Sequence, residues 1–401
     1  MRKITLIYID SGGGHRAAAT ALRDVIGRQN RPWEVELVCI QNLFAPIDFV
    51  RRFTGIPFQD IYNIVLRNGW TLGSGQMIRA MHQIMRMSHG SQVKMLRQYW
   101  AQSQPDLVVS LIPHFNRAIK EALDVTRPGV PFVTILTDIA DHPPHFWIER
   151  ESQYVICGSE RAANQARAIG IAPDYIFQTS GMILNPAFYA TPKVDREVER
   201  IRLGLHPNVP TGLVLFGGEG SDEMVSIARA LDRKSNQPVQ LIMLCGKNAK
   251  VAARLRALGG RIPMFIEGFT REVPLYMELA DFFIGKPGPG SISEALAKRL
   301  PVIVQRNAWT LAHERYNADW VEEQGTGLVV RDFAAEIGAA VETLLTPENY
   351  DRFRRRAAST RNMAVFEIPD ILDRIMHESH RLELKGESMR KKMAALALEE
   401  N

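Results

Sequence analysis

The chain has 401 residues, of which 46% are hydrophobic and 23% charged, and its formal net charge is +5. This is the composition of a globular protein long enough for two domains, and no apolar run of about 18 residues predicts a transmembrane helix. Three widely spaced cysteines, Cys39, Cys157 and Cys245, fit neither a disulfide framework nor a metal site and indicate buried thiols in a reducing cytoplasm. The mild positive charge allows an anionic partner such as a nucleotide or a membrane surface.

The N-terminal sequence MRKITLIYID predicts a buried first strand rather than a signal peptide, because its apolar run ends at Asp10. Short apolar runs then alternate with helical patterns. Strands are predicted at 4–10, 34–40, 106–112, 131–137, 154–157 and 175–179, and again at 212–216, 239–244, 263–266, 281–284, 301–304 and 327–330. Helices are predicted between them, among others at 15–28, 91–103, 115–124, 160–168, 222–233, 291–299 and 311–324. This alternation is typical of parallel sheets joined by right-handed crossovers.

The pattern starts again after the proline- and charge-rich segment 186–210, where a new strand leads into the glycine turn FGGEGS at 216–221. We therefore predict an α/β protein with two Rossmann-like domains, at 1–188 and 189–360. A charged helical tail, 361–401, follows them and either packs back across the first domain or is partly loose.

The first predicted strand is followed by SGGGHRAAATAL at 11–22, a glycine-rich turn that opens a helix. Such a turn lets a ligand approach the backbone and aims free N–H groups at an anion. Gly12, Gly14 and Ala17 also fit the dinucleotide fingerprint, but Gln41 stands where that site has an acidic residue. A tight turn without a ligand remains open.

His15 is the informative residue of this turn. At the first turn of a helix the dipole disfavours the charged imidazolium, and a neutral imidazole suits a general base for a hydroxyl nucleophile. A histidine that only caps or packs the helix fits the local sequence equally well.

The segment ADFFIGKPGPGSISEALAKRLPVIV at 280–304 predicts a strand, a tight turn and a helix. Ser291 with Glu294 three residues later predicts a capping box. The same helix start can hold a diphosphate without a metal, and Glu294 can reach ribose hydroxyls. Glu294 as a plain capping residue is the alternative.

No Asp or Glu occurs from Ile61 to Pro105, whereas the stretch contains basic residues and a methionine-rich pattern at 70–100, with Met77, Met81 and Met85 at helical spacing. A basic, methionine-rich amphipathic segment fits an anionic membrane surface and a groove for acyl chains. The alternative is a core helix with a solvated arginine face.

SGGGHRAAATAL and GKPGPGSISEAL together resemble the GT-B glycosyltransferases of family 28, most closely the monogalactosyldiacylglycerol synthases and the processive diacylglycerol glucosyltransferases. The resemblance runs over roughly 4–345 and implies two parallel sheets facing each other across a cleft. It implies His15 as catalytic base, with Gly13, Gly14, Asp138 and His142 on the acceptor side. On the donor side it implies the glycines Gly217, Gly218, Gly220, Gly288 and Gly290, together with Ser291, Glu294, His313, Glu314 and Asn317. His313 stands where the family has glutamine, so the sugar stays open.

The resemblance also implies an inverting, metal-independent transfer from a UDP-sugar to a lipid acceptor, with the UDP-sugar as donor substrate and no cofactor. The expected location is cytoplasmic, peripheral on the inner face of the cell membrane, with contact through 70–100. A UDP-N-acetylglucosamine 2-epimerase or a non-catalytic nucleotide-sugar sensor are the alternatives. A nucleic-acid partner ranks last, because the aromatic residues do not cluster with the arginines.

Overall fold

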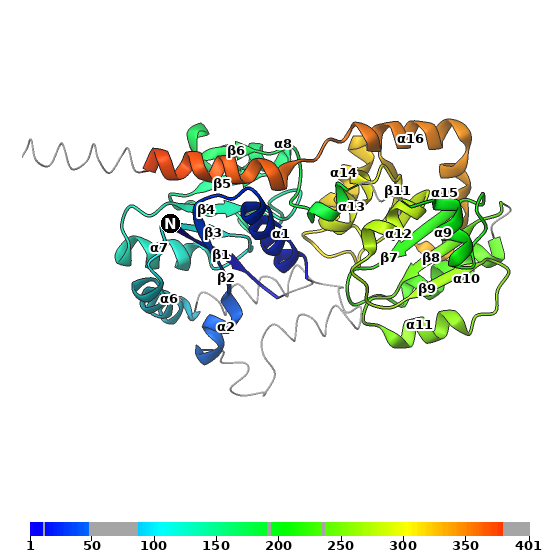
Figure 1. Cartoon of the computed structure of the whole chain (residues 1–401), viewed down its shortest axis with the longest axis horizontal. Coiled ribbons are helices and arrows are strands. Elements are labelled where there is room, and N and C mark those ends of the chain that lie inside the picture. The colour runs from blue at the N-terminus through cyan, green and yellow to red at the C-terminus, as the bar shows by residue number, and fades with distance from the viewer. Residues whose placement is uncertain (11–12, 48–86, 191–193, 235–236, 380–401) are drawn as a thin grey trace, which may run out of the picture.

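The computed structural model describes residues 1–10, 13–47, 87–190, 194–234 and 237–379. These residues form two parallel sheets of six strands each, side by side along the long axis of the molecule (Figure 1). The predicted α/β fold with two Rossmann-like domains is thereby confirmed. Every predicted strand is present, with its ends shifted by at most two residues.

The first sheet has the strand order β2-β1-β3-β4-β5-β6. Its strands are Arg2–Tyr8 (β1), Trp33–Cys39 (β2), Leu107–Ser110 (β3), Phe132–Ile135 (β4), Tyr154–Cys157 (β5) and Ile176–Gln178 (β6). The helices and short turns of this half are Gly14–Arg28 (α1), Ile40–Phe44 (α2), Ala45–Ile47 (η1), His89–Ser103 (α6), Asn116–Thr126 (α7), Glu160–Ile169 (α8), Pro173–Tyr175 (η2) and Pro186–Phe188 (η3).

Both faces of the first sheet are covered, which explains its continuously apolar strands. Ile4 and Leu6 point to the face covered by α1 and the C-terminal helix, whereas Ile7 and Val108 point to the face covered by α2, α6 and α7. The period of two along each strand therefore separates two cores.

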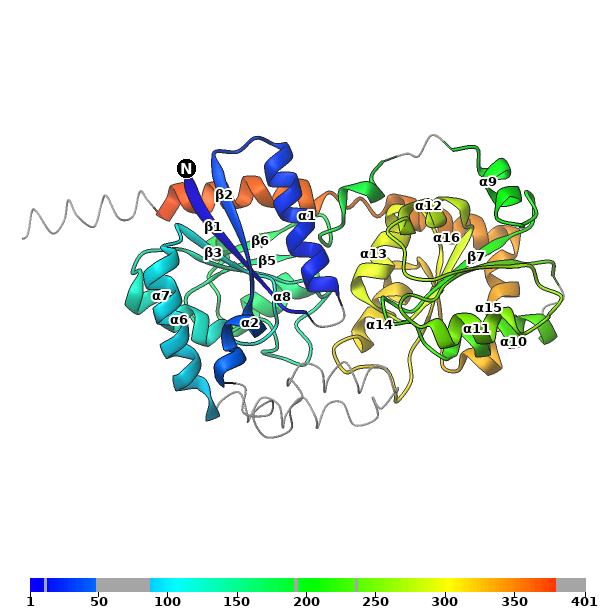
Figure 2. The same cartoon turned by 60° about the horizontal axis from the view of Figure 1, so that its bottom comes forward.

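The second sheet has the order β12-β11-β10-β7-β8-β9. Its strands are Thr211–Leu215 (β7), Gln240–Leu244 (β8), Met264–Glu267 (β9), Phe282–Gly285 (β10), Val302–Gln305 (β11) and Gly327–Val330 (β12). The helices are Arg196–Arg202 (α9), Glu223–Lys234 (α10), Ala249–Arg256 (α11), Val273–Leu279 (α12), Pro289–Ala297 (α13), Arg315–Gln324 (α14), Phe333–Leu345 (α15) and Pro347–Ser359 (α16). Helices α10, α11 and α15 cover one face of this sheet, and helices α12, α13 and α14 cover the other (Figure 2).

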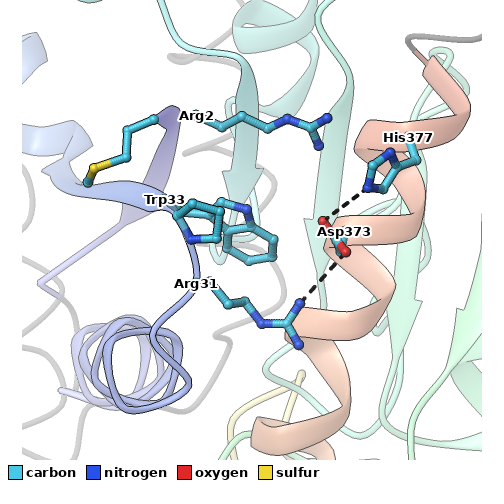
Figure 3. Close-up of a pocket in the computed structure, with 7 residues that line it drawn as sticks. Arg2, Arg31, Trp33, Asp373 and His377 are labelled. Atoms are coloured by element: carbon cyan, nitrogen blue, oxygen red, sulfur yellow. Dashed lines mark ion pairs between the residues drawn. The ribbon is translucent and has the colours of Figure 1, made fainter.

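The chain crosses between the domains twice, and the second crossing leads into a helix at 364–379 that lies along the first domain (Figure 1). Its buried residues Ile368, Leu372 and Ile375 join the core of the first sheet. Figure 3 shows Asp373 of this helix between Arg31 and His377, at 4.0 Å and 3.7 Å. Residues 364–379 thus complete the first domain.

The amphipathic stretch 70–100 lies mostly outside the described residues, as do Met77, Met81 and Met85. Its described end belongs to α6, where Val93, Leu96 and Trp100 are buried in the first-domain core. No helix among the described residues is long and apolar enough to cross a membrane.

Candidate active site

The loops after the strands of the first sheet meet loops of the second domain. Phe146 of the first domain stacks on His313 of the second, with ring centroids 5.7 Å apart and planes 13° apart. Close by, the Arg161 guanidinium lies 5.2 Å from the ring centroid of Tyr316, again across the two domains. The two domains are therefore in direct contact here, and five of the predicted site residues lie near groups of the other domain: His15, Asp138, His142, His313 and Glu314.

His15 lies in the first turn of α1, after the left-handed residue Gly13 (φ 84°) that precedes the helix. A Cβ at Gly13 or Gly14 meets nothing within 4 Å, so it is the positive φ of Gly13 and not a lack of space that favours glycine in this turn. The turn follows β1, next to β3, where the strand order of the first sheet reverses. Ligands of open parallel sheets bind at such switch points. Gly12 lies outside the described residues.

The imidazole of His15 is oriented by two groups from other loops. Its Nδ1 lies 2.9 Å from the carbonyl oxygen of Leu111 and 3.0 Å from Oγ1 of Thr137. A carbonyl oxygen only accepts, so Nδ1 carries the proton and Nε2 keeps its lone pair. The neutral ring is thus set to receive a proton at Nε2.

The surroundings of His15 keep it neutral. Burial lowers the pKa of His15 to about 4, a hydrogen bond to Leu111 works against that change, and the nearby His313 adds to it. The residue nevertheless keeps partial exposure to solvent. A ring that is neutral at physiological pH and still accessible fits the predicted base.

Trp147 lies beside His15, with ring centroids 5.7 Å apart, and is itself fully buried. Its indole Nε1 donates to Asp138 at 2.8 Å, and its backbone N–H donates to Asp141 at 2.7 Å. Burial raises the pKa of Asp138, although the nearby His313 and the bond from Trp147 act against that rise. Asp138 therefore holds the Trp147 ring beside His15 and has no direct hydrogen bond to the His15 ring.

His142 follows in the same loop and is partly exposed. Burial, and then the positive charges of Arg161 and Arg315, lower the pKa of His142. Because Arg315 belongs to the second domain, His142 also lies where the two domains meet, and its role on the acceptor side stays a prediction.

The two glycine turns of the second domain are neighbours, because β7 and β10 are adjacent at the switch point of that sheet. A Cβ on Gly217 meets Cε of Lys286 at 3.7 Å, whereas Gly218 has open space. Gly220 has φ 63°, and a Cβ there lies 2.4 Å from the carbonyl oxygen of Cys245. Gly220 is thus required by the packing of one turn against the next.

The helix after GKPGPGS begins earlier than predicted, and the capping box is wrong. Gly288 is the N-cap and Pro289 the first helical residue, since proline has no N–H to lose there and its φ already fits. Ser291 is consequently inside the helix and does not cap it. The N–H groups of Gly290 and Ser291 in the first turn have no partner within the helix, and their role in holding a diphosphate stays a prediction.

Glu294 lies on the next turn of α13. The residue is partly exposed, its carboxyl group makes no hydrogen bond or ion pair with any described residue, and burial raises its pKa to about 8. A carboxyl group held without a partner in this position is available for ligand hydroxyls.

His313 and Glu314 come just before α14, and Asn317 lies in its first turn. Glu314 accepts from Nζ of Lys286 at 2.6 Å. Although burial by itself raises the pKa of Glu314, Lys286 and His313 bring it below its ordinary value. Asn317 donates to the carbonyl oxygen of Pro287 at 2.9 Å, which fastens α14 to the glycine turn.

Two polar atoms of this segment are buried without a hydrogen-bond partner: Nδ1 of His313 and Oδ1 of Asn317. Such groups are costly to leave unpaired, so they indicate places where a ligand hydroxyl completes the bonding. Around the site, the described residues contain no group of three or more His, Cys, Asp or Glu side chains arranged to hold a metal ion.

Three groups near the site were not among the residues predicted from the sequence: the Leu111 carbonyl, Lys286, and Asn116, whose buried amide donates to the carbonyl oxygens of Ile112 and Trp147. Lys286 had a signal, since it stands in the GKPGPGS turn. Leu111 acts only through its backbone carbonyl and the contacts of Asn116 are set by the fold, so neither shows in a sequence motif.

Comparison with known proteins agrees with this geometry. Residues 212–375 match the model of the glycosyltransferase family 28 C-terminal domain. A probable monogalactosyldiacylglycerol synthase 2 of Oryza sativa subsp. japonica is 29% identical over 82% of this chain and 71% of its own length. Monogalactosyldiacylglycerol synthase 1 of Arabidopsis thaliana is 27% identical over 97% of this chain and 72% of its own.

Among solved structures, the Staphylococcus aureus MnaA–UDP complex has a TM-score of 0.60 at 16% identity, covering 94% of this chain and 97% of that one. Acinetobacter baumannii MurG has a TM-score of 0.58 at 13% identity, covering 93% of this chain and all of that one. At these identities the likeness shows the fold alone.

Two parallel sheets with their sites at facing switch points, together with these likenesses, define an enzyme of the GT-B class, a UDP-sugar-dependent glycosyltransferase. The resemblance drawn from the glycine motifs is confirmed. Within that class, residues 212–375 of the chain match the C-terminal domain of glycosyltransferase family 28.

Proposed function

We propose that this enzyme transfers a hexose or N-acetylhexosamine from a UDP-sugar to the hydroxyl group of a diacylglycerol-like lipid, with inversion and without a metal ion. The observation that carries the proposal is that His15 is neutral and has its proton on Nδ1. Leu111 occupies its Nδ1, which leaves Nε2 to take a proton from an incoming hydroxyl.

The donor side is built from the second domain. The N–H groups at Gly290 and Ser291 and the positive end of α13 receive the diphosphate, and they stabilise it as it leaves. Glu294 accepts from the ribose. His313, Glu314 and Asn317 face the sugar. The unpaired Oδ1 of Asn317 accepts a hydrogen bond from one sugar hydroxyl, and the unpaired Nδ1 of His313 bonds to another.

Inversion follows from the separation of these two halves. The base belongs to the first domain and the leaving group is held by the second, so the acceptor hydroxyl attacks the anomeric carbon from the face opposite the diphosphate. The proton goes to Nε2 of His15, the new glycosidic bond forms, and the bond to UDP breaks. Helix-start N–H groups supply the charge stabilisation that a cation gives elsewhere.

A lipid acceptor is supported by the printed names of the relatives, which are monogalactosyldiacylglycerol synthases. It is also supported by the acid-free, basic sequence from Ile61 to Pro105. Such a segment attracts an anionic leaflet, and we propose a peripheral position on the cytoplasmic face of the cell membrane through 70–100. Diacylglycerol has a single free hydroxyl, which matches a site with one base.

The test is a transfer assay with purified protein, a membrane lipid extract and, in separate reactions, UDP-glucose, UDP-galactose and UDP-N-acetylglucosamine, with lipids read by mass spectrometry. We expect one new glycolipid with one donor. The solved structures that share this fold include a UDP-GlcNAc 2-epimerase of Neisseria meningitidis. Conversion of the donor sugar to its epimer without a glycolipid product would therefore contradict the proposal.

A further inference from the structure

Asn116, the first residue of α7, is 1% exposed and bonds to three different places in the first domain. Its Nδ2 donates to the carbonyl oxygen of Ile112 at 3.1 Å and to that of Trp147 at 3.0 Å. Its Oδ1 accepts from Oγ of Ser110 at 2.6 Å. Because both carbonyls can only accept, the orientation of the amide is fixed, and both of its N–H groups are used.

These partners lie on both sides of His15. Ile112 directly follows Leu111, whose carbonyl oxygen accepts from His15, and the N–H of Leu111 donates to Ile7 of β1 at 2.9 Å. Trp147 places its ring beside His15. A single buried amide thus joins the two loops that determine where the His15 ring lies and which nitrogen carries the proton.

The loop before Asn116 is in a conformation that it does not adopt by itself. His114 and Phe115 have φ values of 90° and 65°, in the left-handed region that non-glycine residues seldom adopt. Two such residues in succession persist only where the surroundings hold them. Phe115 packs on Phe44 and His114 packs on Phe146, at 5.1 Å and 4.5 Å between ring centroids, while Asn116 holds the backbone on either side of the pair.

We propose that Asn116 is a positioning residue for the transfer reaction: it holds the Leu111 carbonyl and the Trp147 ring in place and so sets the tautomer and direction of His15. It reaches neither substrate. The inference rests on the proposed role of His15 as base. Ser110 in turn positions Asn116, because its hydroxyl occupies the amide oxygen.

The test replaces Asn116→Asp, which keeps the shape of the side chain but sets oxygen against the two carbonyls. ¹⁵N NMR of the imidazole, with the His15 signals found by comparison with His15→Ala, reads tautomer and pKa without substrate. We expect a mixture of tautomers and a pKa that rises from about 4 toward the ordinary value, since a loosened loop relieves burial, the largest cause of the shift. We expect kcat to fall about 10- to 100-fold, with KM for the UDP-sugar changed less than about 2-fold.

Gln240 offers a matched control in the second domain. It is fully buried, and its amide donates to His206 and Thr211 at 2.7 Å and 2.9 Å, far from the loops around His15. Gln240→Glu is expected to lower the melting temperature and leave the His15 tautomer unchanged. Ser110→Ala keeps both Nδ2 bonds and is expected to give a smaller change of the same kind than Asn116→Asp.

If Asn116→Asp does not fold, Asn116→Ser is measured in the same way, because a hydroxyl can still bond one of the two carbonyls. An unchanged tautomer and pKa in a folded Asn116 variant would overturn the inference and leave Asn116 with a structural role alone. The role of the base is read separately: full activity of His15→Ala contradicts the proposed function, while the NMR result still decides whether Asn116 orients the ring.

Discussion

Nδ1 of His15 bonds to the backbone carbonyl of Leu111 at 2.9 Å, across 96 residues of sequence. The orientation of the proposed base therefore comes from the main chain of the neighbouring strand end, with Thr137 beside it, and the carboxylate of Asp138 is turned instead to Trp147. A carbonyl partner fixes the tautomer without adding a negative charge, so the imidazole gains little basicity and remains neutral.

His15→Ala is expected to lower kcat by about 100- to 10,000-fold, the range that a general base contributes. The Kd for UDP, measured by calorimetry, is expected to stay within about 2-fold of the wild-type value. The donor site belongs to the other domain, and a group that acts only in the chemical step does not contribute to donor binding. His377→Ala, at the far end of the first domain beside Asp373, is the control and should keep full turnover. Turnover by the His15→Ala enzyme at the wild-type rate would remove His15 as the base.

The lowered pKa of His15 also predicts how stability depends on pH. Its pKa falls from 6.5 to about 4 on folding, so the unfolded chain binds more protons between these values. Stability contributed by the neutral ring is therefore complete above about pH 6.5 and is lost as the pH falls toward about 4. Melting temperatures measured across this window should fall less steeply for His15→Gln than for the wild type; parallel curves would contradict the prediction.

The fold was predictable because its signals are local and repeated. Buried strands such as LVVSLIP and TGLVLF are apolar on both faces, and glycine turns follow the carboxyl ends of β1, β7 and β10, the strands at the switch points. The start of α13 was misjudged because the capping signal of Ser291 and Glu294 competes with Pro289, which fits the first helical position better.

The sequence could indicate candidate site residues only where a motif contains them. His15 and Glu294 stand in motifs, whereas the contacts that tune them come from distant parts of the chain. The left-handed backbone at His114 and Phe115, and the carbonyl of Leu111, depend on tertiary packing that no local pattern encodes. The pairing of Lys286 with Glu314, 28 residues apart, depends on β10 and β11 being neighbours in the sheet.

Gly220 allows a test of whether the close packing between the two turns is needed for stability. Gly220→Ala places a Cβ 2.4 Å from the Cys245 carbonyl oxygen at a positive φ, and overpacking of this kind costs about 1–3 kcal/mol. Gly218→Ala is the matched control, because a Cβ there meets nothing within 4 Å. Chemical denaturation should show a clear loss of stability for Gly220→Ala only. Equal stability of the two variants would mean that the close approach between the two turns is not required.

Metal independence is tested by chelation. Activity is expected to be unchanged after extensive dialysis against EDTA, because N–H groups at the start of α13 stabilise the leaving diphosphate in this proposal. The control is readdition of Mg²⁺ or Mn²⁺, which should not raise kcat beyond its level before dialysis. Loss of activity on chelation and recovery on readdition would show that the helix start does not suffice.

Glu294 links donor binding to pH. Burial raises its pKa to about 8, and the carboxylate form is the one that accepts hydrogen bonds from ribose hydroxyls. Binding of UDP should therefore release protons near neutral pH, and the affinity should rise with pH up to about 8 and level off above it. Isothermal titration in buffers of different ionisation enthalpy measures this release directly, at pH values above the phosphate titration near about 6. Glu294→Gln should bind UDP more weakly and lose the pH dependence, whereas Glu278→Gln, on the surface near Lys298, should retain it. An unchanged affinity and slope in Glu294→Gln would place the ribose elsewhere in the second domain.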